Sequence, residues 1–137
     1  MGRLVTLGGA PALDSAVRMV VVQSSNPDDL QTQVQAQLNA VIEGGTEVLV
    51  DAEIEGAGDG HTFIVTLLLA TGSAPAAGTL LRVWMGANRE AFQLAFENAV
   101  APFVEADPSY TIGGYGIAGG DQGTRFCGLV LLIPGIN

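Results

Sequence analysis

The chain has 137 residues, of which 48% are hydrophobic and only 14% are charged, against about 25% charged in an average globular protein. Its net charge is −9, and its five basic residues are arginines that are never adjacent in the sequence. Nucleic acids and anionic membranes are bound by clustered cations, so the composition argues against both as partners. A surface with so little charge is normally covered by a partner, which favours a homo-oligomer or a component of a larger assembly.

The single cysteine, Cys127, cannot form an internal disulfide, and it is interpreted as a small core residue. The first residues lack the apolar core of a signal peptide, and the longest apolar stretch, residues 63–70, is too short to cross a bilayer. The sequence therefore predicts a soluble protein.

Residues 1–16 show no periodicity and are predicted to form an extended arm. Such an arm is either disordered or laid across a neighbouring subunit. A solvated tail seldom carries many aliphatic residues, which favours the second alternative. The aliphatic side chains expected to make this contact are Leu4, Val5, Leu7 and Leu13.

Residues 17–72 are predicted to form a β-α-β-β unit, called here the first unit. An apolar strand over residues 17–23 is followed by a helix that Asn26 caps and that Pro27 begins. Gly44 and Gly45 end this helix.

A hairpin completes the first unit. In its first strand, the alternation places Val48, Ala52 and Ile54 on one face and Leu49 on the other. The returning strand is apolar on both faces, which is typical of a central strand.

After a linker at residues 73–78, residues 79–135 are predicted to form a second β-α-β-β unit. Its helix starts at Asn88, and Pro102 is expected to kink or end that helix. The aromatic residues of this unit are interpreted as core residues. They are Trp84, Phe92, Phe96 and Phe103.

The two units match in order when the chain is shifted along itself. The shift that places Asn26 on Asn88, called here the helix shift, also places the apolar positions of the first helix on those of the second. After the hairpin turn the match needs a shift longer by one position, called here the hairpin shift, which places Phe63 on Phe126. The pattern predicts a tandem duplication with pseudo-twofold symmetry within one compact α+β domain. Its two helices are expected on one face of a single mixed or antiparallel sheet.

Few residues are candidates for chemistry. His61 lies in a turn near Asp59 and is interpreted as a solvent-exposed residue rather than a general base. No metal site, cofactor site or catalytic group is predicted. The Gly-rich turns join strands instead of opening helices, which argues against nucleotide binding. The single histidine and the single cysteine are far apart in the sequence, which argues against a transition-metal site.

The carboxylates Asp51, Glu53 and Glu55 alternate along one strand and are interpreted as a solvated face, with cation binding as the alternative. Under the helix shift their counterparts are Gly113, Tyr115 and Ile117. This difference suggests that Tyr115 and Ile117 belong to a subunit contact.

Two β-α-β-type units in one short chain make residues 17–135 resemble the tautomerase superfamily in topology. The resemblance implies a trimer in which six pseudo-equivalent units form a ring. The activity of that family depends on an amino-terminal proline, whereas here Gly2 follows Met1 and the first proline is Pro11. The activity is therefore not carried over.

The favoured hypothesis is a non-enzymatic structural protein that forms a homo-oligomer, possibly trimeric, with a virion component such as a bacteriophage capsid decoration protein as its best example. Its partners would be further copies of itself and a capsid shell protein. The alternatives are a tautomerase-like trimeric enzyme and a small-ligand-binding regulatory domain with a pocket between the two units. The chain would be located in the virion if it is structural, and in the cytoplasm otherwise.

Overall fold

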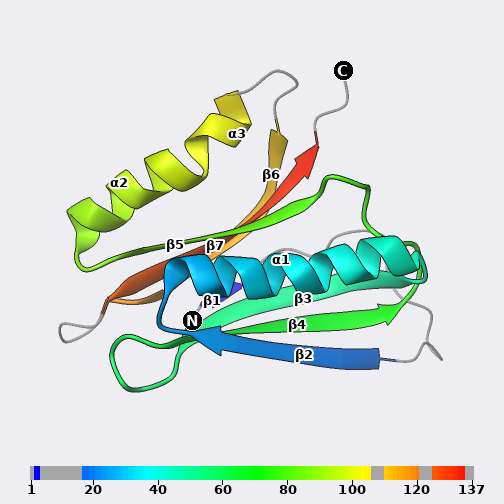
Figure 1. Ribbon diagram of the computed structural model, residues 1–137, viewed down its shortest axis with the longest axis horizontal. Coiled ribbons are helices and arrows are strands. Elements are labelled where there is room, and N and C mark those ends of the chain that lie inside the picture. Colours follow the sequence, from blue (N-terminus) through cyan, green and yellow to red (C-terminus); the bar gives the residue numbers. More distant parts are fainter. Residues whose placement is uncertain (1, 4–16, 106–109, 121–124, 135–137) are drawn as a thin grey trace.

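The fold was analysed in a computed structural model, which describes residues 2–3, 17–105, 110–120 and 125–134. The protein is α+β, with two antiparallel sheets and helices packed against them (Figure 1). Sheet A has the strand order β1 (Gly2–Arg3), β3 (Glu47–Gly56), β4 (Phe63–Thr71) and β2 (Val17–Ser24). Sheet B has the order β5 (Leu80–Gly86), β7 (Phe126–Pro134) and β6 (Tyr110–Gly119). The helices are α1 (Pro27–Gly44), α2 (Arg89–Ala99) and α3 (Ala101–Glu105).

The predicted boundaries of α1 are confirmed. The Asn26 side chain accepts a hydrogen bond from the backbone N–H of Asp29 at 2.9 Å, which satisfies one of the free amides at the start of the helix. Pro27 occupies the first helical position, and Gly45 ends the helix with a φ of 72°, a conformation that glycine adopts without strain.

The predicted interruption of the second helix is also confirmed. Asn88 caps α2 by accepting from the backbone N–H of Ala91 at 2.9 Å. The helix ends at Ala99, and the short helix α3 contains Pro102 in its first turn. Proline has no N–H to donate to the preceding turn, so a continuous helix cannot run through this position.

The expectation of one sheet with both helices on the same face is wrong. Two separate sheets form, and sheet B lies between two layers of helix (Figure 1). One face of sheet B packs with α1 and sheet A in the larger core, and its other face packs with α2 and α3 in a smaller, aromatic core. The sheets do not join through β5 because α1 lies along the edge of that strand and occupies its backbone groups.

A β-bulge in β3 reverses the predicted orientations of the residues before it, so Val48 lies on the face opposite to Ala52 and Leu49 lies on the same face as Ala52. Leu49 pairs with Leu69 and Asp51 pairs with Leu68, so one residue between them is left without an opposite partner. The extra residue brings Leu49 onto the same face as Ala52, and both are buried in the larger core. Simple alternation had placed them on opposite faces.

Part of the predicted N-terminal arm is described. Gly2 and Arg3 form β1, which pairs with Ile54 and Glu53 of the same chain. The arm residues expected to contact a neighbour lie outside the described residues, and they are Leu4, Val5, Leu7 and Leu13.

Candidate functional site

Two glutamines of α1 cover the edge of β5. The Gln31 side chain donates to the carbonyl of Leu81 at 2.6 Å and accepts from the N–H of Val83 at 2.6 Å. Gln35 accepts from the N–H of Leu81 at 2.9 Å and donates to the carbonyl of Thr79 at 3.3 Å. An edge strand otherwise presents unpaired backbone groups that attract another strand. The side chains of α1 therefore take the place of a fourth strand beside β5.

At β2 a side chain of α1 covers only the C-terminal end of the strand, where Gln33 donates to the carbonyl of Gln23 at 3.1 Å. Among the described residues β2 pairs only with β4, through eight consecutive positions without a bulge. Alternate backbone N–H and C=O groups along β2 consequently point away from the sheet. A long, regular edge of this kind is one that other strands or side chains bind.

The outer face of sheet A, which is turned away from α1, is apolar beside this edge. On β2, Val17, Met19 and Val21 are 65%, 63% and 57% exposed. Residues opposite one another in a sheet share a face, so β4 extends this surface through Leu68, which pairs with Met19, and Thr66, which pairs with Val21. Ile64 continues the same face of β4. We call these six residues the outer face: Val17, Met19, Val21, Ile64, Thr66 and Leu68.

A second apolar surface is a cavity of about 580 Å³ between α2 and sheet B. Sheet B contributes the floor, made of Trp84, Ile112, Tyr115, Ile117 and Val130. Helix α2 contributes one wall, made of Phe92, Gln93, Phe96 and Glu97.

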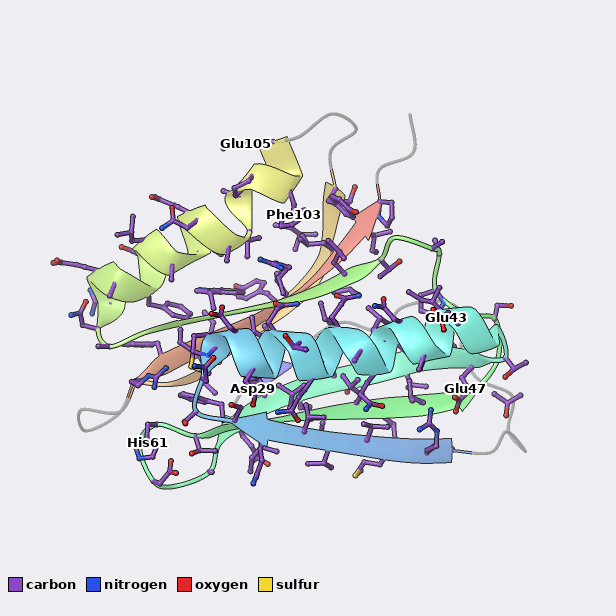
Figure 2. The ribbon with its side chains drawn as sticks, viewed as in Figure 1. Asp29, Glu43, Glu47, His61, Phe103 and Glu105 are labelled. Carbon is purple, nitrogen blue, oxygen red and sulfur yellow. The ribbon has the colours of Figure 1, made fainter. Side chains whose placement is uncertain are left out.

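The cavity is open because α2 packs over β5 and leaves β6 uncovered. The aromatic core under α2 is well formed, with Trp84 stacked on Phe92 at 5.4 Å between ring centroids and edge-on to Phe96 at 5.2 Å. Phe103, labelled in Figure 2, extends this core from α3 and meets the ring of Tyr110 edge-on. On β6, by contrast, large apolar side chains face outward, with Tyr115 63% exposed and Ile117 40% exposed.

One polar group at the cavity has no partner. Trp84 is 4% exposed, and among the described residues its indole N–H has no hydrogen-bond acceptor. A buried donor without an acceptor costs about 1–3 kcal/mol.

The sequence-predicted chemical residues lie elsewhere. His61 is in the loop between β3 and β4 with its side chain 60% exposed, and it is not among the residues that line the cavity (Figure 2). Hydrogen bonds from Thr62 and from the backbone of His61 hold the pKa of the Asp59 carboxyl well below its usual range. These contacts organise the turn, and neither Asp59 nor His61 is among the residues that line the cavity.

Cys127 and the acidic strand also lie apart from the cavity. Cys127 is fully buried in the larger core, and burial raises the pKa of its thiol to about 12, so it is not a nucleophile at neutral pH. On β3, Asp51 is buried, Glu53 is half-buried and Glu55 is exposed. In the part of the chain that the structure describes, no three His, Cys, Asp or Glu side chains come together as a metal site.

Of the predicted contact residues, Tyr115 and Ile117 are described, and both line the cavity. The sequence pattern did not identify the outer face, because an apolar strand flanked by a helix is normally buried on both sides. It did not identify Gln93 and Glu97 either, since polar residues on a helix usually face solvent.

The fold and these two surfaces define an α+β protein in which both sheets carry exposed apolar side chains. In the described residues, no helix has both the length and the hydropathy needed to cross a membrane. Comparison of the chain with protein-family models, with curated proteins and with solved structures gives no match.

Proposed function

We propose that this chain is a tandem duplication of one β-α-β-β unit and that it functions as a non-enzymatic structural subunit of a homo-oligomer. The observation that carries the proposal is the pair of open apolar surfaces, one on each sheet: the outer face and the cavity. Monomeric proteins rarely leave contiguous apolar patches of this kind open, and such patches are typical of protein–protein contacts.

The connectivity of the two sheets supports the duplication. In each unit a strand, a helix and a hairpin follow one another along the chain, and the second hairpin strand pairs with both other strands. In sheet A, β4 lies between β3 and β2, and in sheet B, β7 lies between β6 and β5. Each sheet also has one register shift at a matching place, between Leu49 and Asp51 in β3 and between Ile112 and Gly114 in β6. The hairpin shift, which places Phe63 on Phe126, superposes these two irregularities as well.

This superposition changes the predicted counterparts of the acidic strand. With the hairpin shift applied from β3 onward, Asp51 corresponds to Gly114, and Tyr115 corresponds to Ala52. Ile117 likewise corresponds to Ile54, and both Ala52 and Ile54 are buried in the larger core. Tyr115 and Ile117 are thus exposed versions of core positions, which supports their role in a contact.

The absence of convergent polar chemistry at the cavity supports a structural role over an enzymatic one. Its walls are aromatic and aliphatic, and the polar side chains among its lining residues are Gln93, Glu97 and the phenol of Tyr115. The single histidine and the single cysteine lie outside it. Of the groups that can act as a general acid or base, the cavity contains Glu97 and the phenol of Tyr115, and both side chains are exposed.

Within this class, we favour a particle component, with decoration of a capsid shell as the example. Low charge and a duplicated unit suit such a role, since a trimer of two-unit chains presents approximate sixfold symmetry to a lattice. The particle would be the chain's location and a shell protein its further partner.

The proposal is tested by the mass of the full chain in solution, measured by light scattering after size-exclusion chromatography. We expect a defined multiple of 14.0 kDa. A single Met19→Asp substitution should reduce that mass to the monomer, whereas Leu94→Asp, on an exposed apolar residue that does not line the cavity, should not. A wild-type chain that stays monomeric at about 100 μM, where a contact with a Kd of about 1 μM would be nearly saturated, would overturn the proposal.

A second candidate function, the binding of a small molecule, is supported by the size and apolar lining of the cavity. A cavity of about 580 Å³ lies within the size range of small-molecule sites. The ligand would be a mainly apolar molecule. Quenching or a shift of Trp84 fluorescence by such compounds, lost in Tyr115→Asp, would support this function. Because Trp84 is the only tryptophan, the signal reports on the cavity directly.

A further inference from the structure

We infer that copies of this chain associate head to tail, with the outer face of one copy seated in the cavity of the next. The inference rests on the proposed self-assembly and specifies its geometry. The occupant of the cavity is thus a second copy of this chain, and its leading element is the edge strand β2.

The template for this contact lies inside the chain. In the first unit, α1 and β3 form the walls of a groove, and the groove is filled by the face of sheet B that carries Leu81 and Val83. Gln31 and Gln35 bind the backbone of the inserted strand β5 at its edge. The groove of the first unit is therefore closed by the second unit of the same molecule.

The groove of the second unit has the same construction but is open. Its helix wall carries Gln93 and Glu97, on which the helix shift places Gln31 and Gln35. Its floor carries Ile112, Tyr115 and Ile117, on which the hairpin shift places three core positions of β3. Those core positions are Leu49, Ala52 and Ile54, which sheet B covers in the first unit. Within the described residues, no strand fills the second groove as β5 fills the first.

The strand that corresponds to β5 is β2, and it is also open. The helix shift places Met19 on Leu81 and Val21 on Val83. Met19 and Val21 are 63% and 57% exposed, whereas Leu81 and Val83 are buried. The chain thus presents an unfilled groove at one place and the matching unoccupied strand at another. One contact between copies would cover six of the seven large hydrophobic side chains that are most exposed in the described residues.

The internal contact specifies which backbone groups are bound between copies. Gln93 would donate to the carbonyl of Met19 and accept from the N–H of Val21 on the next copy. These bonds reproduce those of Gln31 with Leu81 and Val83. The β2 edge would then be covered by side chains of α2, as the β5 edge is by α1.

Glu97 is a weaker match than Gln35, and this difference can be tested. Its carboxylate can accept from the N–H of Met19, as Gln35 accepts from Leu81, but it has no amide to donate to the carbonyl of Val17. Glu97→Gln restores the donor and should tighten association about 3- to 10-fold, the effect of one additional hydrogen bond. Gln93→Glu should weaken association by a similar factor.

A contact between two different surfaces continues from copy to copy. It closes into a ring when the rotation between copies divides a full turn, and it otherwise extends into a filament. A closed ring of three copies would contain six units, and the measured mass distinguishes this outcome from others.

The decisive experiment mixes two variants that are each defective on one side. Met19→Asp destroys the outer face and keeps the cavity, while Tyr115→Asp destroys the cavity and keeps the outer face. Both residues are largely exposed, so each variant should fold, which circular dichroism checks. We expect each variant alone to associate at least about 30-fold more weakly, and therefore to be mainly monomeric at about 10 μM, where a contact with a Kd of about 1 μM would still be mostly formed. The 1:1 mixture should form a heterodimer of one copy of each, and no larger species.

Other arrangements give different results. If two β2 edges joined symmetrically, Tyr115→Asp would remain a homodimer, and if two cavities joined, Met19→Asp would. In either case the mixture would form no heterodimer, and the head-to-tail geometry would be overturned. A wild-type chain that is monomeric throughout would instead overturn the proposed self-assembly itself. Retention of the wild-type mass by both variants would assign the contact to another surface and would overturn the inference.

Discussion

Replacing Gln31 by leucine tests whether side chains of α1 substitute for a neighbouring strand at the β5 edge. Leucine keeps the volume and helix propensity of glutamine but removes both 2.6 Å hydrogen bonds, to the Leu81 carbonyl and from the Val83 N–H. Each bond contributes about 0.5–1.5 kcal/mol to stability. A backbone group that stays buried without a hydrogen-bond partner adds its desolvation penalty to this loss. Because the site is part-buried, we expect a loss of about 2–4 kcal/mol in the free energy of unfolding.

Urea unfolding measures this loss, and it is best performed in the Met19→Asp background so that association does not contribute to stability. The matched control is Gln93→Leu, the corresponding change on exposed α2, which should alter stability by no more than about 0.5 kcal/mol. Hydrogen exchange should locate the effect: the Val83 amide should lose protection in Gln31→Leu, while the Leu81 amide keeps its bond to Gln35. If Gln31→Leu unfolds like its parent, the glutamines do not hold this edge, and the template for the contact between copies is lost.

The packing and the ionisable groups give three more expectations. Gly128→Ala should destabilise the chain by about 1–3 kcal/mol and shift tryptophan fluorescence, because a Cβ there would collide with the Trp84 ring; an unchanged spectrum would contradict the packing of Trp84 over β7. Since burial raises the pKa of Cys127 to about 12, the thiol should react with alkylating reagents only as fast as the chain opens. Stability should also fall as the pH rises above about 8.5, where only the unfolded chain releases the thiol proton; rapid labelling of the native protein would exclude this burial. The pKa of Asp59 is lowered by hydrogen bonds from Thr62 and His61, so its contribution to stability is present above about pH 3.9 and is lost as the pH falls. A carboxyl titration by NMR with a midpoint at the ordinary value would contradict that hydrogen bonding.

The sequence by itself determined the elements whose signals are local. The cap at Asn26, the glycine at position 45 and the break near Pro102 involve neighbouring residues only, and all three are found where they were predicted. Helix ends and turns depend on the conformations of a few consecutive residues, so the sequence carries them directly.

The arrangement of the sheets was decided by tertiary structure. Nothing in the periodicity of α1 distinguishes a glutamine in solvent from one bound to a distant strand, as Gln31 is bound to Leu81 of β5. That contact separates the two sheets, which the sequence pattern had joined into one. The bulge in β3 likewise depends on the register with β4 and reverses the face of Leu49.

The candidate contact surfaces combine both kinds of information. The sequence marked Tyr115 and Ile117 as an unusual pair, but it did not place them in a cavity beside Gln93 or relate them to Met19 on the other sheet. Burial of an apolar strand depends on what packs over it, and this is known only once the chain is folded. The sequence thus predicts two similar units, while the tertiary structure determines that only one of their two grooves is filled.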